Sequence, residues 1–329
     1  MKRIRRIITL GPKSLNKSFL ILIRNKVDLL RLNMSHLNIK ELKKNILFIK
    51  KHSSIPICID TEGAQIRTKI VREKILKKGQ EIKISFSKKD LSLYPNNVQE
   101  QLKINDILNV GFDNLFIKIK SKNVRKNFLI AKTISGGKVE NNKGVHLLKR
   151  KIKLNYLTDK DIKAIEVGKK LKINYYALSF TNTLQDVINF NKMLKNKFKI
   201  FKIETSKAVK NFSQLIKAGD NFLIDRGDLS KDISLEKTPI IQRKIFQIKK
   251  KSKLNKEIYI ATNLLESMIS NNSPTRGEIN EIYSNLEMGA NGLVLAAETA
   301  IGKNPYSSIS GVDIKLNFLG DNCTISARP

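Results

Sequence analysis

The sequence predicts an α/β fold, a TIM (β/α)8 barrel with a small all-β lid domain inserted after strand 3. Two observations carry this prediction. Eight short apolar runs of the kind that form buried strands alternate with longer amphipathic stretches typical of helices. The alternation breaks once, over residues 69–148, where Gly-punctuated β-like runs replace the helices.

The expected barrel strands share buried, β-branched or aromatic residues followed by polar ones. In chain order they are 5–11, 27–35, 55–62, 173–180, 198–204, 220–228, 257–263 and 291–299. The expected helices share an apolar face, and several end in Gly or a Lys-rich turn, as helix C-termini do. They are 38–52, 159–172, 207–219, 242–253 and 276–290.

This pattern divides the chain into domains. We expect residues 1–68 and 149–310 to form the barrel, residues 69–148 the inserted β-rich domain, and residues 311–329 a short tail. The insertion leaves the barrel just after Arg67, at the end of strand 3, which is the catalytic face of such barrels. A domain inserted there is well placed to act as a lid.

The bulk composition narrows the function classes. The formal charge of +34 is compatible with polyanion binding, but the lysines are spread along the chain and no zinc-finger or RNP-like motif occurs, so we expect no specific nucleic-acid partner. No apolar run is long enough to span a membrane, and the N-terminus lacks a secretory pattern. The two cysteines cannot form a disulfide framework, which fits a cytoplasmic location.

Residues 202–229 are the most informative stretch for function. One apolar run ends on Lys202 and Glu204, and the next ends on Asp225, Arg226, Gly227 and Asp228. Neighbouring parallel strands bring these groups to one edge of a sheet. Paired carboxylates suit a hard divalent cation such as Mg²⁺, and a lysine beside them suits a transferring phosphoryl group.

Other predicted strands also end in polar groups. The remaining candidates at these ends are Arg31, Asn33, Ser35, His36, Asp60, Thr61, Glu62, Arg67, Ser179, Thr262, Glu298 and Thr299. Positive charge for a phosphate together with carboxylates for a metal is what phosphoryl transfer needs, because its catalysis is mainly positioning and charge neutralisation. The alternative is a web of structural salt bridges at the barrel rim, in which Asn33 and Ser35 only shape a turn.

Motifs spread over residues 5–310 resemble the pyruvate kinase family. In family order they are TLGPKS at 9–14, RLNMSH at 31–36, DTEGAQIRT at 60–68, GGKVENNKGVHL at 136–147, LTDKD at 157–161, ALSF at 177–180, KIET at 202–205, RGDL at 226–229, ATNLLESM at 261–268, SPTRGE at 273–278 and ETAIGKNP at 298–305. The resemblance implies the same barrel and lid, and a kinase that transfers the phosphoryl group of phosphoenolpyruvate to ADP, giving pyruvate and ATP in glycolysis.

The resemblance also implies roles for individual residues. Catalysis would rest on Lys202, Arg31 and Thr262, and the substrate would be bound by Arg31, Lys202, Gly227, Asp228 and Thr262. Glu204 and Asp228 would ligate Mg²⁺. Asn33, Ser35, Asp60 and Thr61 would form a K⁺ site, and His36, Arg67 and Lys143 would meet the nucleotide phosphates.

The chain departs from the family pattern in three ways. It ends soon after strand 8, which predicts no allosteric control through a further C-terminal domain and leaves a homodimer through the barrel open. In the third strand motif, Glu62 replaces a lysine, Ala64 replaces a proline and Gln65 replaces a glutamate. That glutamate accompanies K⁺ dependence in the family, so this dependence stays open. Asp225 replaces a small residue beside the substrate carboxylate, where it would either repel that group or pair with a nearby lysine or arginine.

Three functional hypotheses remain. The first is a minimal pyruvate kinase. The second is a pyruvate-kinase-like protein that binds phosphoenolpyruvate or an analogue with different or lost catalysis, motivated by Asp225 and Glu62. The third is a polyanion-binding protein with the same fold. Steeply salt-dependent nucleic-acid binding would support this hypothesis.

Overall fold

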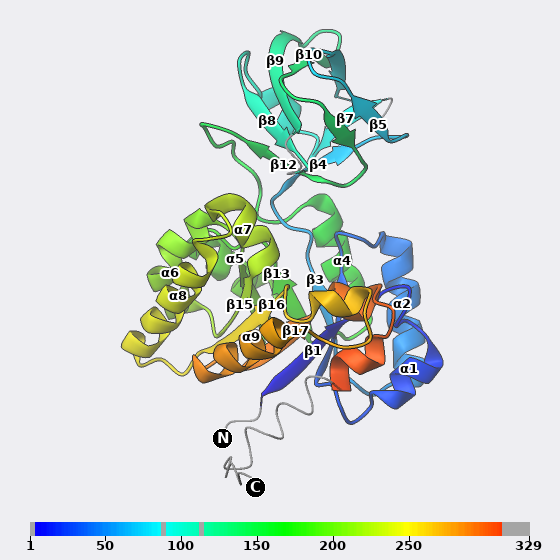
Figure 1. Ribbon diagram of the computed structural model, residues 1–329, viewed down its shortest axis with the longest axis vertical. Coiled ribbons are helices and arrows are strands. Elements are labelled where there is room, and N and C mark those ends of the chain that lie inside the picture. The colour runs from blue at the N-terminus through cyan, green and yellow to red at the C-terminus, as the bar shows by residue number, and fades with distance from the viewer. Residues whose placement is uncertain (1–3, 87–89, 112–114, 311–329) are drawn as a thin grey trace, which may run out of the picture. The chain divides into compact units, whose positions relative to one another are not determined.

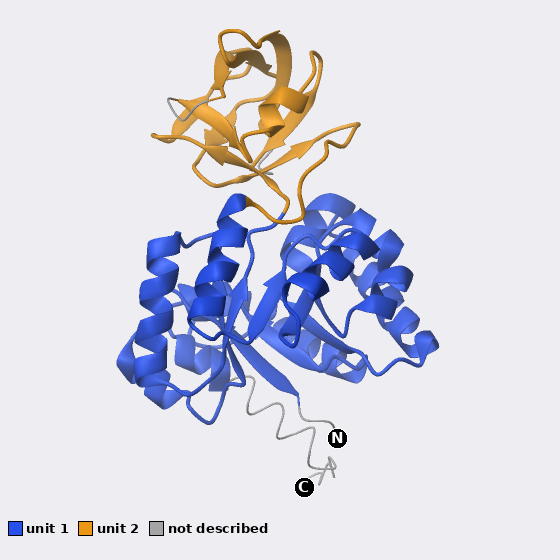
Figure 2. Cartoon of the chain, turned by 180° about the vertical axis from the view of Figure 1, so that it is seen from behind, with its two compact units in different colours: residues 1–63, 159–329 blue, residues 64–158 orange. Residues whose placement is uncertain are grey.

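The computed structural model describes residues 4–86, 90–111 and 115–310. The chain divides into two compact units, residues 1–63 with 159–329 and residues 64–158, coloured blue and orange in Figure 2. We call them the barrel unit and the inserted unit and describe each by itself. No helix in the described ranges combines the length and hydropathy that a membrane crossing needs.

The barrel unit is built on eight parallel strands that close into a barrel in the order β1-β17-β16-β15-β14-β13-β3-β2. The strands are β1 (Arg5–Thr9), β2 (Leu29–Asn33), β3 (Ile57–Asp60), β13 (Tyr175–Leu178), β14 (Phe198–Ile203), β15 (Asn221–Asp225), β16 (Glu257–Ala261) and β17 (Gly292–Leu295). All eight fall within the predicted runs, so the TIM-barrel prediction is confirmed.

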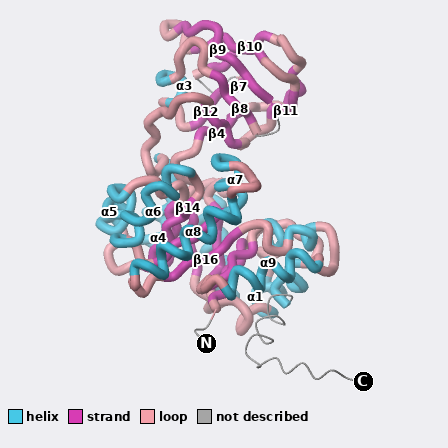
Figure 3. Tube along the Cα trace, turned by 60° about the vertical axis from the view of Figure 1, so that its left-hand side comes forward, coloured by secondary structure: helices cyan, strands magenta, loops and turns pink. Residues whose placement is uncertain are grey.

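Helices follow the strands around this barrel, as the labelled ribbon and the coloured tube show (Figures 1 and 3). They are α1 (Lys17–Leu22), α2 (Ile39–His52), α4 (Asp159–Lys170), α5 (Leu184–Met193), α6 (Ser206–Ala218), α7 (Arg226–Ile233), α8 (Thr238–Ser252), η1 (Glu266–Ile269), α9 (Arg276–Glu287) and α10 (Ala297–Ala300). The five predicted helices are present as α2, α4, α6, α8 and α9. The motif pattern did not predict α5, although Thr183 and Asp186 form a capping box at its start.

Apolar side chains fill the inside of the barrel. The cluster comprises Ile7, Leu29, Cys58, Ala177, Ile200, Leu223, Tyr259, Ala261 and Val294, all nearly or fully buried. Cys58 is therefore a core residue, and burial raises the pKa of its thiol far above the ordinary value. A filled interior leaves the strand ends as the place where polar groups can gather.

The inserted unit is a second, smaller barrel in the order β10-β6-β7-β4-β12-β8-β9, with a separate two-stranded sheet of β11 and β5. Its elements are β4 (Ile66–Lys69), β5 (Lys74–Leu76), β6 (Glu81–Ser85), β7 (Leu91–Tyr94), α3 (Val98–Gln101), β8 (Ile107–Val110), β9 (Leu115–Asn123), β10 (Phe128–Thr133), β11 (Gly137–Val139) and β12 (Gly144–Leu147). It has its own apolar core, which includes Ile84, Leu108, Ile119 and Leu129. The prediction of an inserted β domain is confirmed, apart from the four-residue helix α3.

The insertion begins earlier than the sequence pattern placed it. Strand β4 pairs with β7 and β12 of the inserted unit. Arg67 therefore lies on a strand of the inserted unit, shortly after the turn at Gly63, where φ is +71°. The sequence placed Arg67 at the end of the third barrel strand because the run 60–68 contains no helix or proline to mark the change of sheet.

Candidate functional site

The carboxyl ends of five barrel strands carry the candidate site. Strand β2 supplies Arg31, and β3 ends on Asp60. Strand β14 carries Lys202 and is followed by Glu204, whereas β15 ends on Asp225 and leads directly into α7 with Asp228 in its first turn. Thr262 follows β16. Because these strands are parallel parts of one closed barrel, their ends meet at one face of it.

Lys202 is the centre of the site. Its side chain is 5% exposed, and its Nζ lies 2.8 Å from Glu204 Oε1, 3.3 Å from Asp60 Oδ2 and 3.3 Å from Asp225 Oδ2. It also lies 3.2 Å from Ser179 Oγ. Burial alone would lower the pKa of Lys202, but the three carboxylates outweigh burial and raise that pKa above its ordinary value. The ammonium therefore stays charged inside the protein.

Arg31 holds Asp60 in place. Its Nε and Nη2 lie 2.7 and 2.6 Å from Asp60 Oδ2, and its Nη1 donates to Thr9 Oγ1 at 2.8 Å. Ser179 Oγ lies 3.2 Å from the other oxygen of Asp60, so its one proton is shared between this oxygen and the nearer Thr61 carbonyl. Asp60 is fully buried, so this set of donors compensates the loss of its hydration. Arg31 and Lys202 thus share one carboxylate and form a buried cationic pair.

Three carboxylates beside Lys202 could hold a metal ion. Glu204, Asp225 and Asp228 each offer an oxygen, and these oxygens lie within 4.8 Å of one another. Glu204 Oε2 accepts the Phe180 N–H at 2.5 Å, whereas Glu204 Oε1 is buried and accepts no hydrogen bond from the described residues. The close partner of Glu204 Oε1 is the Lys202 ammonium at 2.8 Å, and an oxygen-only donor set of three neighbouring carboxylates fits a hard divalent cation such as Mg²⁺.

The pKa of Glu204 agrees with the interpretation of these carboxylates as a metal site. Burial first, and then the charges of Asp225 and Asp228, raise its pKa well above the ordinary value, against the opposing charge of Lys202. Asp225 behaves differently, because Lys202 and Arg31 overcome the effect of burial and lower its pKa. Among the described residues, the four carboxylates Asp60, Glu204, Asp225 and Asp228 outnumber the cations that contact them, Arg31, Lys202 and Lys231, and a divalent ion relieves such an excess.

Thr262 is held in a strained backbone conformation at the mouth of the site. Its φ is +67°, in the left-handed region that a β-branched residue rarely adopts. Arg226 Nη2 and Nε donate to its carbonyl oxygen at 2.6 and 3.1 Å, and its Oγ1 accepts the Gly227 N–H at 2.7 Å. Phe180, whose N–H meets Glu204, also has a positive φ of 51°. Strain at two strand ends of one barrel face is typical of functional sites.

The predicted monovalent-cation residues lie together at the ends of β2 and β3. Asn33 and Asp60 are partners in the strand register. Asn33 Oδ1 accepts the Ser35 N–H at 3.0 Å, which is the turn contact that the sequence offered as the alternative. The Thr61 carbonyl accepts from Ser179 Oγ at 2.7 Å. Asp60 already contacts two cations, Arg31 and Lys202, and none of these contacts tests K⁺ binding. The K⁺ site therefore stays a prediction.

The predicted nucleotide residues are divided between the two units. His36 belongs to the barrel unit, whereas Arg67 and Lys143 belong to the inserted unit. Arg67 pairs in register with Gly144, so Arg67 and Lys143 lie close together where β4 meets the start of β12. Lys143 Nζ lies 3.1 Å from Glu140 Oε2, and the lysine side chain is 46% exposed. The role of these three residues toward a nucleotide stays a prediction.

Two residues that differ from the family motifs, Asp225 and Glu62, each form an ion pair with a lysine. Asp225 pairs with Lys202, the second of the two outcomes that the sequence left open. Glu62 Oε2 lies 2.9 Å from Lys160 Nζ, which also donates to the Met34 carbonyl at 2.5 Å. Lys160 belongs to the LTDKD motif, but its contact with Glu62 could not be predicted, because the two residues stand 98 positions apart in the chain.

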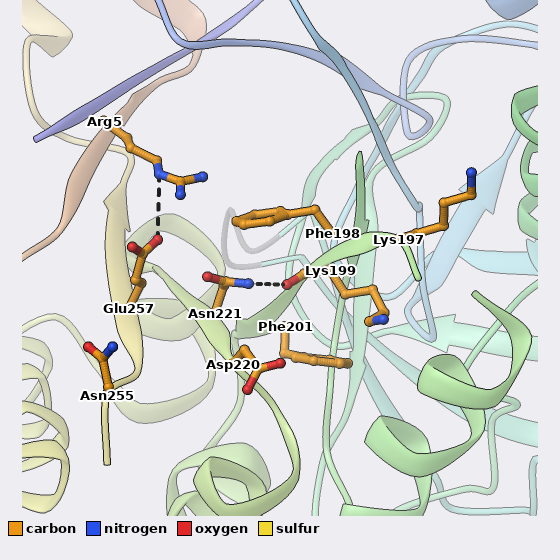
Figure 4. Close-up of a pocket in the computed structure, with 9 residues that line it drawn as sticks. All are labelled: Arg5, Lys197, Phe198, Lys199, Phe201, Asp220, Asn221, Asn255 and Glu257. Carbon is orange, nitrogen blue, oxygen red and sulfur yellow. Dashed lines mark hydrogen bonds and ion pairs between the residues drawn. The ribbon is translucent and has the colours of Figure 1, made fainter. Parts of the chain in front are cut away.

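A polar pocket at the opposite end of the barrel is not the candidate site (Figure 4). Its lining residues stand where β1, β14, β15 and β16 begin, and include Arg5, Lys199, Asn221 and Glu257. Arg5 lies 3.5 Å from Glu257 and over the Phe198 ring, so its charge is already engaged within the pocket. Polar groups at this end of such barrels usually serve stability rather than catalysis.

Comparison with known proteins agrees with the geometry. A family model described as "Pyruvate kinase, barrel domain" matches residues 1–309. Similar proteins include the pyruvate kinase of Thermotoga maritima (29% identical, 94% of this chain, 69% of the relative) and that of Clostridium perfringens (32%, 94% and 68%). Plastidial pyruvate kinase 3, chloroplastic, of Arabidopsis thaliana is 31% identical over 92% of this chain and 56% of its own length. The chain thus spans between about half and two thirds of the length of these relatives.

Proposed function

Because the chain belongs to the pyruvate kinase family, in its barrel domain, we propose that it transfers the phosphoryl group of phosphoenolpyruvate to ADP, giving pyruvate and ATP. The observation that carries this proposal is the contact of the buried Lys202 ammonium with Glu204, beside a cluster in which Glu204 and Asp228 can share one cation. Buried positive charge next to oxygen ligands is the arrangement that phosphoryl transfer requires.

In this proposal the cations of the site act on the moving phosphoryl group. Lys202 neutralises charge on the phosphoryl oxygens and on the enolate that remains, and Arg31 binds the phosphate. Glu204 and Asp228 would hold Mg²⁺, which supplies further positive charge to the phosphoryl oxygens when bound. Arg31 and Lys202 are both less than a tenth exposed, so their charges act with little screening by water.

The opposite side of the site binds the rest of the substrate. The first turn of α7 would offer the N–H groups of Gly227 and Asp228 to the substrate carboxylate, as helix N-termini do for anions. For Gly227 this means that the N–H turns from Thr262 Oγ1, to which it donates at 2.7 Å, to the substrate. Thr262 lies beside the carbon that is protonated after transfer. His36, Arg67 and Lys143 would contact the phosphates of ADP or ATP.

A coupled assay tests this function. We expect pyruvate formation that requires ADP and Mg²⁺, and no pyruvate above background with either K⁺ or Na⁺ would refute the proposal. Lys202→Arg keeps the buried charge but changes its shape, and it should lower kcat by at least about a hundredfold. The matched control is Lys199→Arg on the same strand, at the opposite end of the barrel, which should leave kcat unchanged.

A second function is favoured by one specific contact. The ion pair of Asp225 with Lys202 competes with any anion for the lysine. If this pair persists in the complex, the protein would bind phosphoenolpyruvate or an analogue without turnover. Calorimetric titration that shows binding, combined with an assay that shows no pyruvate, would favour this alternative over the first.

A further inference from the structure

Asp225 takes part in two interactions at once. It is 5% exposed, and its Oδ2 lies 3.3 Å from Lys202 Nζ while its Oδ1 lies 3.3 Å from Thr262 Oγ1. One of its oxygens also lies within 4.8 Å of the ligand oxygens of Glu204 and Asp228. Asp225 therefore stands between the buried cation and the acidic cluster.

The charges around Asp225 do not balance. Among the described residues, four carboxylates, Asp60, Glu204, Asp225 and Asp228, face the buried cations Arg31 and Lys202 and the half-exposed Lys231. The buried Arg226 is also near Asp225, but it is paired with Glu281. Arg31 is engaged by Asp60, so the other three carboxylates share Lys202, apart from the half-exposed Lys231 beside Asp228. Buried negative charge in excess of the neighbouring positive charge is costly, so this arrangement favours an additional cation.

A second observation points to the same ligand. Glu204 is 1% exposed, and its Oε1 accepts no hydrogen bond from the described residues. Its close partner is the Lys202 ammonium, at 2.8 Å, which Glu204 shares with Asp60 and Asp225. A buried carboxylate that shares one ammonium with two other carboxylates is poorly compensated, and a divalent cation would complete its set of partners.

We propose that Asp225 is a third carboxylate ligand of the divalent-cation site, alongside Glu204 and Asp228. When the cation binds, it takes Asp225 as a ligand, which weakens the ion pair of Asp225 with Lys202. Lys202 then becomes available to an anion, so the cation binds before the phosphorylated substrate. This inference depends on the proposed function for the position of the metal site. It does not depend on the proposed reaction.

The test measures Mn²⁺ binding by calorimetry with no substrate present, so its readout does not depend on turnover. We expect Asp225→Asn to weaken Mn²⁺ binding at least tenfold and Glu204→Gln to do the same. Asp220→Asn is the matched control, because Asp220 stands just before the same strand at its other end and its side chain is 76% exposed. This variant should bind Mn²⁺ like the unmodified chain.

A further variant separates a ligand from a charge acting at a distance. Asp225→Glu keeps the charge but moves the oxygens by one methylene, so a ligand role predicts weakened binding, whereas a through-space effect predicts unchanged binding. Circular dichroism confirms that each variant is folded, and Asp225→Ser replaces Asp225→Asn if the latter does not fold.

Unchanged Mn²⁺ binding in the Asp225 variants, with binding lost in Glu204→Gln, would overturn the inference and leave the proposed pair of ligands standing. Unchanged binding in the Glu204 variant as well would overturn both. An absence of pyruvate formation together with weakened Mn²⁺ binding in the Asp225 variants would refute the proposed reaction and support the inference.

Discussion

Replacing Lys202 by Met should destabilise the barrel unit strongly. The ammonium is the shared partner of Asp60, Glu204 and Asp225, at distances of 2.8 to 3.3 Å. Removing it leaves buried carboxylates uncompensated, and breaking a buried ion pair in this way costs about 3–5 kcal/mol. Asp60 keeps Arg31, so the cost falls mainly on Glu204 and Asp225.

Urea unfolding followed by far-ultraviolet circular dichroism, with EDTA present, measures this effect. All described helices except the four-residue α3 belong to the barrel unit, so the helical signal reports that unit. With an m value of about 3 kcal/mol/M, the midpoint should fall by about 1 M or more. Lys199→Met, on the same strand at its half-buried end, should shift it far less.

A second substitution tests the cause. Asp225→Asn removes one uncompensated charge, so the double variant Lys202→Met, Asp225→Asn should regain about 1–2 kcal/mol of the lost stability. A Lys202→Met variant within about 1 kcal/mol of the unmodified chain would refute the reasoning, because it would mean that water or protons neutralise these carboxylates at little cost.

Three further changes should also affect stability. Arg150→Met removes the partner of Asp106 and should cost about 1–3 kcal/mol in the inserted unit, measured by hydrogen exchange of β8. Burial opposes ionisation of Asp106, but Arg150 outweighs it and lowers that pKa, so this contribution is present above pH 3.8 and fades as the pH falls below it. Thr275→Ala removes the capping box of α9 and should cost about 1 kcal/mol in thermal unfolding. Gly168→Ala would place a methyl group 2.6 Å from Ile59 Cδ1 and should cost about 1–3 kcal/mol in the same measurement, since the core there is already full.

The barrel strands could be predicted because each is a short, mostly apolar run that ends in polar residues. In β15, for example, all five residues are buried, as expected for a parallel strand that is covered on both faces. Helix α7 could not be predicted in the same way. Its sequence, RGDLSKDI, is mostly polar and contains Gly227, and it is helical because it begins at the end of a strand and packs on β15 and β16.

The site residues were predictable as a set, but their contacts were not. Polar residues at the ends of parallel strands identify Arg31, Asp60, Lys202 and Glu204, because the fold brings such ends together. The partner of each residue depends on barrel geometry rather than on sequence spacing. Asp60 and Lys202 are separated by 142 positions, and nothing in the local sequence indicates that they touch.

A chain can belong to the family and still lack its activity, and Asp225 is the residue on which this depends here. Identities of 29–32% with the relatives described above establish the barrel, but they do not determine whether Lys202 can leave a buried carboxylate to meet a phosphate. An ion pair in a low-dielectric pocket is broken only if another charge takes over one partner. A cation held by Glu204, Asp225 and Asp228 would supply that charge, so a carboxylate that on its own repels the substrate would be compatible with it as a ligand of the cation.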